Sequence, residues 1–383
     1  MSRTERAEIV IIGGGIAGLM CAFFLTRHGL REIVVVDANY PQGGASGRNG
    51  TLVRGGFSSP EWCRFYGHSL ELWQGLSAML GENVMYTRRG YAIIAESERT
   101  AEICAEALAA HRETGVQSRA LNAAALKRVL PNIDHARVRA SVYFDDGGIA
   151  PHHAVMKGLM AACRRAGVAL RYHTRVTGIE TAAGRATGVA IGDHRIAADT
   201  VVLAGGGHNL ELAALAGVEL DGVAMRIQAI ATEPLRPLIG PGLALIDRAA
   251  YLHQTARGEV MGGCEVVEPH RTDITSDLPV MAATAHHFVA MFPALASVRV
   301  LRQWSGIVHV SSDYGQLLGP HPDLDGLWLS AGWLYGIAGA PAGGALLAKA
   351  IATGEIDERM RPFAVDRARR GVAITERSLV MLE

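Results

Sequence analysis

Hydrophobic positions near the start of the chain predict a strand, a helix and a second strand in close succession. Residues 9–12 and 33–36 are unbroken runs of Ile and Val, and residues 16–28 between them are mostly apolar. Strands that are apolar at every position are covered on both faces, as in a parallel sheet, and the helix between them provides the crossover. The glycines at 13–15 permit the tight turn that joins the first strand to the helix.

The same combination of helix and apolar strand recurs later in the chain. A helix is predicted near residues 153–166 and a strand at 169–172. Further apolar strands at 200–203 and 326–329 are each followed by glycines. We therefore expect these segments to extend the sheet that the first three elements begin.

Two segments between residues 43 and 76 contrast in character. Residues 43–56 are rich in Gly, Ser, Asn and Arg, which predicts a loop laid against a ligand. The residues after it have large apolar side chains at three- and four-residue intervals, which indicates a helix whose apolar face is turned to the core and is not an aromatic substrate box. These residues are Trp62, Phe65, Tyr66, Leu70, Trp73 and Leu76.

Short strand-like pieces and isolated helices in residues 86–143 and 222–310 interrupt this α/β pattern. We predict an α/β fold in which a Rossmann-like domain is interwoven with an α+β substrate domain, built from a mixed sheet plus helices. The Rossmann-like domain takes residues 1–84, 148–221 and 325–383, and the substrate domain takes residues 85–147 and 222–324.

Charge and apolar content narrow the class of protein. Thirty-seven basic residues balance 37 acidic ones without a dense Lys/Arg run, which argues against nucleic acid or an anionic membrane as partner. Residues 9–25 approach the length of a short membrane span, but the glycine cluster inside them and the acids Glu5 and Glu8 before them favour a buried strand, turn and helix.

Cysteine and histidine spacing predicts no metal site. The five cysteines are scattered without paired spacing, which is typical of reduced, mostly buried thiols in a cytoplasmic protein. The pairs His152–His153 and His286–His287 lack the i, i+4 spacing that would place two ligands on one helix face.

The first glycine turn carries the clearest chemical signal. Gly13, Gly15 and Gly18 form G-x-G-x-x-G between strand and helix, and Asp37 ends the next strand. The glycines let the backbone approach a pyrophosphate at the helix N-terminus, and the acid accepts a hydrogen bond from a ribose hydroxyl. This combination predicts a bound dinucleotide, either NAD or FAD.

Later turns favour FAD. The loop Arg48-Asn49-Gly50-Thr51 follows the first unit, and glycine turns follow at Ala204-Gly205 and at Gly332. Several backbone turns that converge on one elongated ligand suit a buried flavin better than an exchanging nicotinamide. The remaining candidate contacts are Ile16, Ala17, Ala38, Val176, Gly336 and Ile337.

The Ala-rich helix after the last glycine turn is expected to begin near Gly339 or Ala340 and to end near Gly354. Its partial positive end would favour negative charge on a reduced flavin ring. Close packing of an Ala/Gly helix on the sheet explains the same composition, and both interpretations stay open.

Longer motifs continue nearly to the end of the chain. Beyond the first turn they are residues 47–54, 89–91, 147–152, 204–208, 233–234, 302–307, Asp313 and 332–333. With these motifs the chain resembles the amino-acid-oxidase-type family of FAD-dependent oxidoreductases, and within it the β subunits of heterotetrameric sarcosine oxidases. The segments 48–54 and 302–307 are the most specific part of this resemblance.

The resemblance implies a noncovalent FAD and oxidation of an amine beside a carboxylate to an imine by hydride transfer. It also implies an α subunit and small subunits as partners, and in some relatives an FMN at the subunit interface on a histidine that corresponds to His152. The arginine that corresponds to Arg54 lies near the substrate carboxylate in such relatives. We add Tyr335 and His253 as candidate catalytic residues.

The chain departs from the sarcosine-oxidising pattern at three positions. Gly339 stands where a lysine is expected, and Ser312 and Gln316 stand where prolines are expected. We therefore expect Arg54 to anchor the carboxylate without help and the space beside residue 339 to admit a substituent bulkier than methyl. A single-chain amine oxidase that produces hydrogen peroxide and a non-catalytic flavin-binding subunit are the alternatives.

Overall fold

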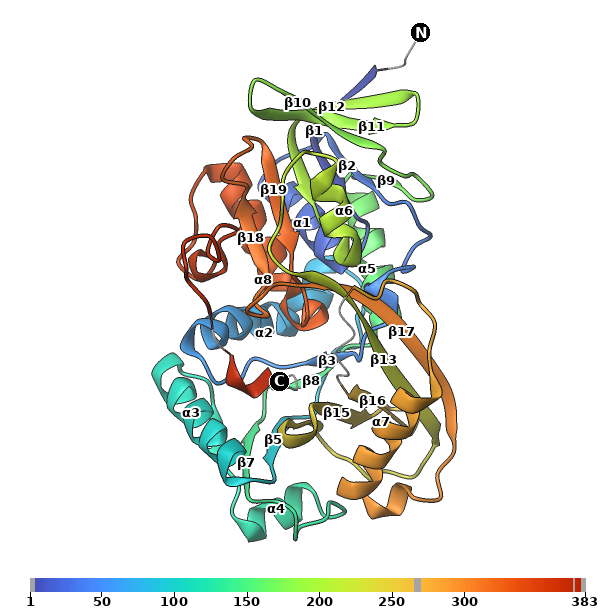
Figure 1. Cartoon of the computed structure of the whole chain (residues 1–383), viewed down its shortest axis with the longest axis vertical. Helices are drawn as coiled ribbons and strands as arrows, with labels where there is room; N and C mark the ends of the chain where they lie inside the picture. Colours follow the sequence, from blue (N-terminus) through green and yellow to red (C-terminus); the bar gives the residue numbers. More distant parts are fainter. Residues whose placement is uncertain (1–3, 265–269, 375, 380–383) are drawn as a thin grey trace.

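The computed structural model describes residues 4–264, 270–374 and 376–379. Figure 1 shows a sheet with helices in the upper part of the molecule and a second sheet with helices in the lower part. Segments far apart in the sequence contribute to each part. The predicted α/β fold with mixed sheets and helices is confirmed.

Among the described residues, eight strands form the first sheet, in the order β10-β11-β12-β1-β2-β9 with β19 beside β12 and β18 beside β19. The strands are β1 (Thr4–Ile12), β2 (Ile33–Val36), β9 (Ala169–Arg171), β10 (Gly178–Ala182), β11 (Arg185–Ile191), β12 (His194–Leu203), β18 (Leu317–Pro320) and β19 (Leu327–Ala331). β1 pairs in parallel with both β2 and β12, as the unbroken apolar runs predict.

Helices cover this sheet. They are α1 (Ile16–Arg27), α5 (His152–Arg165), α6 (Asn209–Ala214) and α8 (Gly336–Thr353), while α2 (Pro60–Leu80) packs against α8. α1 and α8 approach closely at Gly344, where an added Cβ would lie 2.6 Å from Cβ of Met20. Only glycine allows that approach, so the composition of α8 serves packing. No described helix combines the length and the apolar character that a membrane span requires.

α2 is the amphipathic helix that the sequence predicts. Pro60 stands at its first position, where the missing N–H costs nothing, and Gly81 ends it in the left-handed conformation with φ of 62°. The six predicted core residues of this helix are all buried, which confirms the interpretation as a core face.

The second sheet has the order β17-β13-β16-β15-β14-β5-β7-β6 in the part of the chain described. Its strands are β5 (Tyr91–Ala95), β6 (Ser118–Ala120), β7 (Ala140–Phe144), β13 (Val223–Pro234), β14 (Gly242–Leu245), β15 (Ala250–Gln254), β16 (Glu259–Cys264) and β17 (Val300–Val310). Helices α3 (Glu98–Thr114), α4 (Ala123–Val129) and α7 (Leu278–Met291) accompany it. β14 and β5 run parallel while the other pairs are antiparallel, so this sheet is mixed.

A small third sheet lies between these two. It consists of β3 (Leu52–Val53), β8 (Gly148–Ile149) and β4 (Thr87–Arg88), in the order β3-β8-β4. The predicted ligand loop 43–56 thus contains β3 and a short 3₁₀ turn at Ala45–Gly47. β18 belongs to the first sheet although residues 222–324 were assigned to the substrate domain, and the domain boundaries stay a prediction.

The five cysteines are buried and free of disulfides. Burial raises the pKa of the Cys21 thiol to about 12, so this thiol stays protonated and unreactive at neutral pH. The predicted buried thiols are therefore present.

Candidate active site

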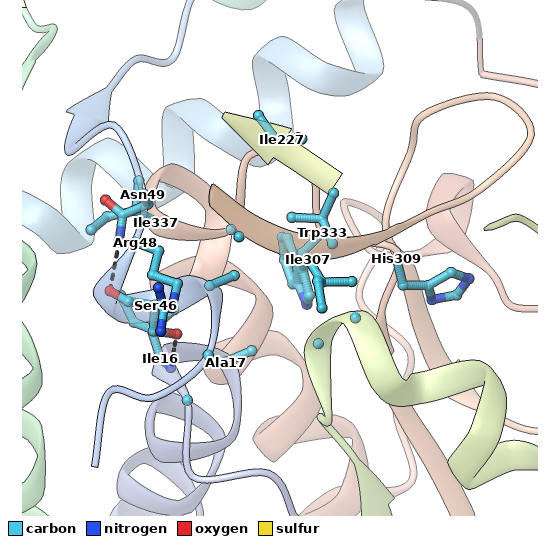
Figure 2. A pocket seen from close by; sticks show the side chains of 18 of the residues that line it. Ile16, Ala17, Ser46, Arg48, Asn49, Ile227, Ile307, His309, Trp333 and Ile337 are labelled. Atoms are coloured by element: carbon cyan, nitrogen blue, oxygen red, sulfur yellow. Dashed lines mark hydrogen bonds between the residues drawn. The ribbon is translucent and has the colours of Figure 1, made fainter. Parts of the chain in front are cut away.

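A cavity of about 1020 Å³ lies between the first sheet and the second. It is lined by the three glycine turns, by the loop 42–52 and by strands of the second sheet. Its size is at the upper end of the roughly 300 to 1000 Å³ that ligand pockets occupy, which suits a ligand as long as a dinucleotide. Ser46, Arg48 and Asn49 line one side, and Ile307, His309 and Trp333 line another (Figure 2).

The first two glycine turns pack on each other. Gly13 has φ of 115°, and an added Cβ would lie 2.2 Å from the carbonyl oxygen of Ala204. An added Cβ on Gly18 would lie 2.0 Å from the oxygen of Gly13, and Gly18 is not among the described residues that line the cavity. Gly13, Gly15 and Gly205 line it, so Gly18 serves the turn while the others border the ligand space.

Asp37 fixes the turn that follows β1. Its Oδ2 accepts a hydrogen bond from the amide of Gly14 at 2.8 Å, and its Oδ1 accepts one from the amide of Asn39 at 2.8 Å. Both bonds hold the carboxylate at the cavity wall, where Ala38 and Val176 also lie. The carboxylate keeps further lone pairs for a ribose hydroxyl.

The loop after β2 is ordered by its own polar side chains. The Ser46 hydroxyl oxygen accepts a hydrogen bond from the amide of Ile16 at 2.9 Å, at the N-terminus of α1 (Figure 2). Asn49 donates from Nδ2 to the carbonyl of Ser46 at 2.7 Å and accepts from the amide of Thr51 at 2.8 Å. Thr51 has φ of 58°, so these bonds stabilise a strained backbone. Arg48, Asn49, Gly50 and Thr51 line the cavity as predicted contacts would.

His253 lies behind this loop. Its side chain is fully buried, and Nε2 lies 3.1 Å from Thr51 Oγ1 and 3.0 Å from the carbonyl oxygen of Gly50. It is not among the described cavity-lining residues. The loop thus stands between the imidazole and the cavity, so the expected direct contact of His253 with a ligand is not seen, and its catalytic role stays a prediction.

His309 lines the cavity and supports the third glycine turn. Nε2 donates to the carbonyl oxygen of Asp221 at 2.9 Å, and Nδ1 accepts from the amide of Gly332 at 3.2 Å. Burial lowers the pKa of His309, so the imidazole is neutral and both nitrogens are engaged. Gly332 has φ of 69° and is itself outside the described cavity lining, so its contribution is the turn.

Arg54 is the most unusual side chain of the cavity. It lines the cavity with 2% of its surface exposed, and none of its guanidinium nitrogens has a hydrogen-bond partner among the described residues. Aromatic rings surround it, with the guanidinium carbon 4.2 Å from the ring centroid of Phe57 and 4.9 Å from that of Tyr335. A buried cation with unused donors is costly unless an anion joins it.

Electrostatics keep this arginine charged. Burial lowers the pKa of Arg54, but Tyr91, Tyr335 and Glu376 outweigh that effect, and the pKa rises above its ordinary value. Tyr335 also lines the cavity, beside Gly336 and Ile337 at the start of α8. The arrangement can hold a carboxylate in a largely apolar environment.

Two sequence expectations about α8 need correction. The helix begins at Gly336 and not at 339 or 340, because the carbonyl of Tyr335 already accepts from the amide of Gly339 at 3.0 Å. The space beside Gly339 is not open, since an added Cβ would lie 2.7 Å from Cζ3 of Trp333 and 2.9 Å from Cε1 of Tyr66. The missing lysine is thus replaced by aromatic rings, and no room for a bulkier substituent results there.

His152 lies outside the described lining of this cavity. It begins α5, its Nε2 is 3.2 Å from Nε2 of His153, and its Nδ1 has no partner among the described residues. Burial, followed by the neighbouring His153, lowers the pKa of His152 to about 4, so it is neutral. A second flavin at His152 would therefore lie outside this cavity, and the expected contact with it stays a prediction.

Several residues that line the cavity were not predicted from the sequence. Ser46 stands in a loop without periodicity, so only the pairing with the amide of Ile16 reveals its place. Ser378 and Leu379 reach the cavity from the far end of the chain. No local pattern could signal these contacts, because tertiary packing creates them.

Comparison with known proteins identifies the family of this chain. The model of the FAD dependent oxidoreductase (DAO) family matches residues 8–350. The chain belongs to this family. This match confirms the prediction, made from the motifs and the resemblance, that the chain is an FAD-dependent oxidoreductase.

Similar proteins match most of the length of this chain. The sarcosine oxidase subunit beta of Rhizobium meliloti is 31% identical over 376 residues, 97% of this chain and 90% of that protein. The glycine oxidase of Pseudomonas putida is 28% identical over 88% of this chain and 92% of its own length. The crystal structure of L-proline dehydrogenase from P. horikoshii has a TM-score of 0.92 at 24% identity, covering 97% of this chain and 100% of that one, which shows the shared fold.

Proposed function

We propose that this chain oxidises a small amine or amino acid that carries a carboxylate. The single observation that carries the proposal is Arg54, a buried cation at the cavity wall whose donors find no partner among the described residues. A substrate carboxylate supplies the missing acceptors in bidentate form. The names of the similar proteins, a sarcosine oxidase subunit and a glycine oxidase, support the same class of substrate.

The residues present fit FAD. Gly15 lets the backbone border the cavity at the N-terminus of α1, the Asp37 carboxylate can accept from a ribose hydroxyl, and Arg48 lines the cavity from the loop 42–52. When bound, FAD supplies the acceptor for a hydride and its electron pair. The donor is the carbon next to nitrogen, whose C–H bond breaks while the nitrogen lone pair forms the C=N bond of an imine and an N–H proton leaves to solvent.

The protein orients the substrate and excludes water more than it moves protons. His309, the buried imidazole at the cavity wall, has both nitrogens in hydrogen bonds and is not available as a base. The amine therefore enters in its neutral form, and Arg54 with the rings of Tyr91 and Tyr335 fixes the carboxylate end.

Assembly is the second part of the proposal. The similarity to sarcosine oxidase β subunits supports an α subunit and small subunits as partners, and an FMN at a subunit interface near His152 belongs to the same hypothesis. A cytoplasmic location is supported by five free, buried thiols.

The decisive experiment is anaerobic mixing of the purified yellow protein with candidate amines while the flavin absorbance is recorded. N-methyl amino acids, D-amino acids, proline analogues and opines form the test set. Bleaching by at least one acid, and not by the matching amine without a carboxylate, is expected. A protein whose flavin no amine reduces would be a non-catalytic flavin-binding subunit, and full turnover with oxygen and peroxide release by the isolated chain would make it a single-chain oxidase.

A further inference from the structure

The last described residues of the chain form part of the cavity wall. Ser378 and Leu379 line the cavity although each side chain is almost fully buried, at 4% exposure. The hydroxyl of Ser378 donates to Glu376, and Leu379 packs in the hydrophobic core beside the cavity. Figure 1 shows this C-terminal segment at the level of β3, between the two sheets.

A carboxylate holds this segment in place. Glu376 accepts hydrogen bonds from the amide of Ser58 at 2.8 Å, from the amide of Ser59 at 2.9 Å and from the hydroxyl of Ser58 at 2.5 Å. It also accepts from the amide and the hydroxyl of Ser378, at 2.9 and 2.5 Å. One buried carboxylate therefore joins the C-terminal segment to the start of α2.

A second set of contacts holds the residues that precede this segment. Asp313 accepts from the amide of Ile374 at 3.0 Å and pairs with the buried Arg367 at 2.5 Å. Arg377 forms an ion pair with Glu106 on α3. Contacts with both parts of the molecule therefore hold this segment in a defined position at the cavity.

The wall stands at the Arg54 end of the cavity. Ser58 follows Phe57, the ring on which the Arg54 guanidinium lies, and Glu376 is near enough to raise the pKa of Arg54. The rings of Phe57, Tyr91 and Tyr335 surround the Arg54 guanidinium, and Leu52 and Ile246 also line the cavity. If Arg54 binds the carboxylate of a substrate, the group next to that carboxylate would lie on the side of the cavity that Leu379 lines.

We propose that Leu379, fixed by the Glu376 contacts, is a specificity-determining residue that limits the size of an apolar substituent on a carboxylate substrate. The proposal rests on the proposed function for the anchoring of the carboxylate by Arg54. It commits the substrate class to acids with a small or medium apolar substituent, because a charged substituent would lose its hydration against this wall without a partner.

The test compares Leu379→Ala and Leu379→Trp with wild type, and with Leu278→Ala as a control, since Leu278 is 67% exposed. FAD content and thermal unfolding verify that each variant folds. For a graded series of amino acids, the ratio of kcat/KM between a large and a small apolar substituent should rise about 10-fold or more in Leu379→Ala, mainly through KM, and fall in Leu379→Trp. Leu278→Ala should leave the ratio unchanged.

A second readout needs no turnover. Acetate, butyrate and hexanoate cannot be oxidised, and their binding is measured from the change in the flavin spectrum. Relative to acetate, hexanoate should bind more tightly to Leu379→Ala than to wild type, and more weakly to Leu379→Trp. Unchanged ratios in both variants, in turnover and in binding, overturn the proposal while the proposed function stands. If no amine reduces the wild-type flavin, the proposed function fails and the carboxylate titration alone decides about Leu379.

Discussion

Single residues decide what the cavity can hold, and Arg54 is the first to test. Arg54→Met removes the buried cation but keeps much of its apolar length, so substrate capture should weaken by about 2 to 4 kcal/mol, roughly 30- to 1000-fold in kcat/KM. Arg54→Lys keeps a charge without the planar fork and should lie between. Arg64→Met, at an exposed position of α2, is the matched control. An unchanged substrate dependence of flavin reduction in Arg54→Met would place the anchor elsewhere.

His253 makes stability depend on pH. Burial lowers its pKa from 6.5 to about 4, so the unfolded chain takes up a proton near pH 6.5 while the folded chain does so only near pH 4. The stabilisation is complete above pH 6.5 and is lost as pH falls through this window, by about 3 kcal/mol. Thermal unfolding between pH 7.5 and 4.5 measures this loss.

His253→Gln should flatten that pH dependence, since glutamine has no proton to take up in the window. His194→Gln at an exposed position should leave the slope as in wild type. Equal slopes in all three proteins would show that folding does not lower the pKa of His253. The comparison uses slopes because His111 and His152, whose pKa values are also lowered to about 4, contribute in every variant.

Residue roles were predictable from the sequence where the backbone itself sets the requirement. Gly13, Gly15 and Asp37 belong to a fixed turn, so the motif alone places them at the cavity. His253 and Leu379 show the limit of such reasoning. His253 lies outside the described cavity lining, and Leu379 is brought to the cavity by packing between distant segments. No local sequence pattern encodes such packing.

At the scale of elements, strands were easier to predict than helix ends. Ile/Val runs predicted β1 and β2, and the largely apolar residues 200–203 predicted the end of β12, because a strand covered on both faces needs apolar residues. The start of α8 was placed too late. Gly336, Gly339 and Pro341 weaken the helical signal, and the tertiary contacts of α8 with α1 and α2 stabilise the helix instead.

The aromatic packing of α8 leads to a test at Gly339. Gly339→Ala places a methyl group against Trp333 and Tyr66 and should cost about 1 to 3 kcal/mol in unfolding free energy, the usual range for overpacking. Gly339→Lys should cost more and displace Trp333, so that FAD content falls and preference does not move toward smaller acids. Gly67→Ala in α2 is the control, since an added Cβ there would meet no atom within 4 Å. A stable, yellow Gly339→Lys protein with a preference for sarcosine would restore the open-pocket interpretation.

At the scale of the whole molecule, the cavity joins the two sheets. Gly15 and Gly205 face it from the first sheet, and Tyr251 and Ile307 face it from the second. The sequence predicted the two regions from alternating segments, but not how their surfaces would meet, because that depends on contacts between residues more than a hundred positions apart. A ligand that touches both sides must stabilise the assembly of the two parts.

Removal of FAD should therefore lower the stability of the whole chain in one transition. A ligand at 100 times its Kd adds about 2.7 kcal/mol, which for a chain of 383 residues corresponds to roughly 3 °C in Tm. Scanning calorimetry of flavin-free protein at increasing FAD concentration measures the shift.

Gly15→Leu is the control, because its side chain extends from the first glycine turn toward Ser46, into the space that the pyrophosphate needs. This variant should fold, remain colourless and melt at one temperature whatever the FAD concentration. If its Tm rises with FAD as in wild type, the cofactor does not occupy the cavity at the first glycine turn. If wild type melts in two steps of which FAD shifts only one, the cofactor is held by one sheet alone and does not bridge both.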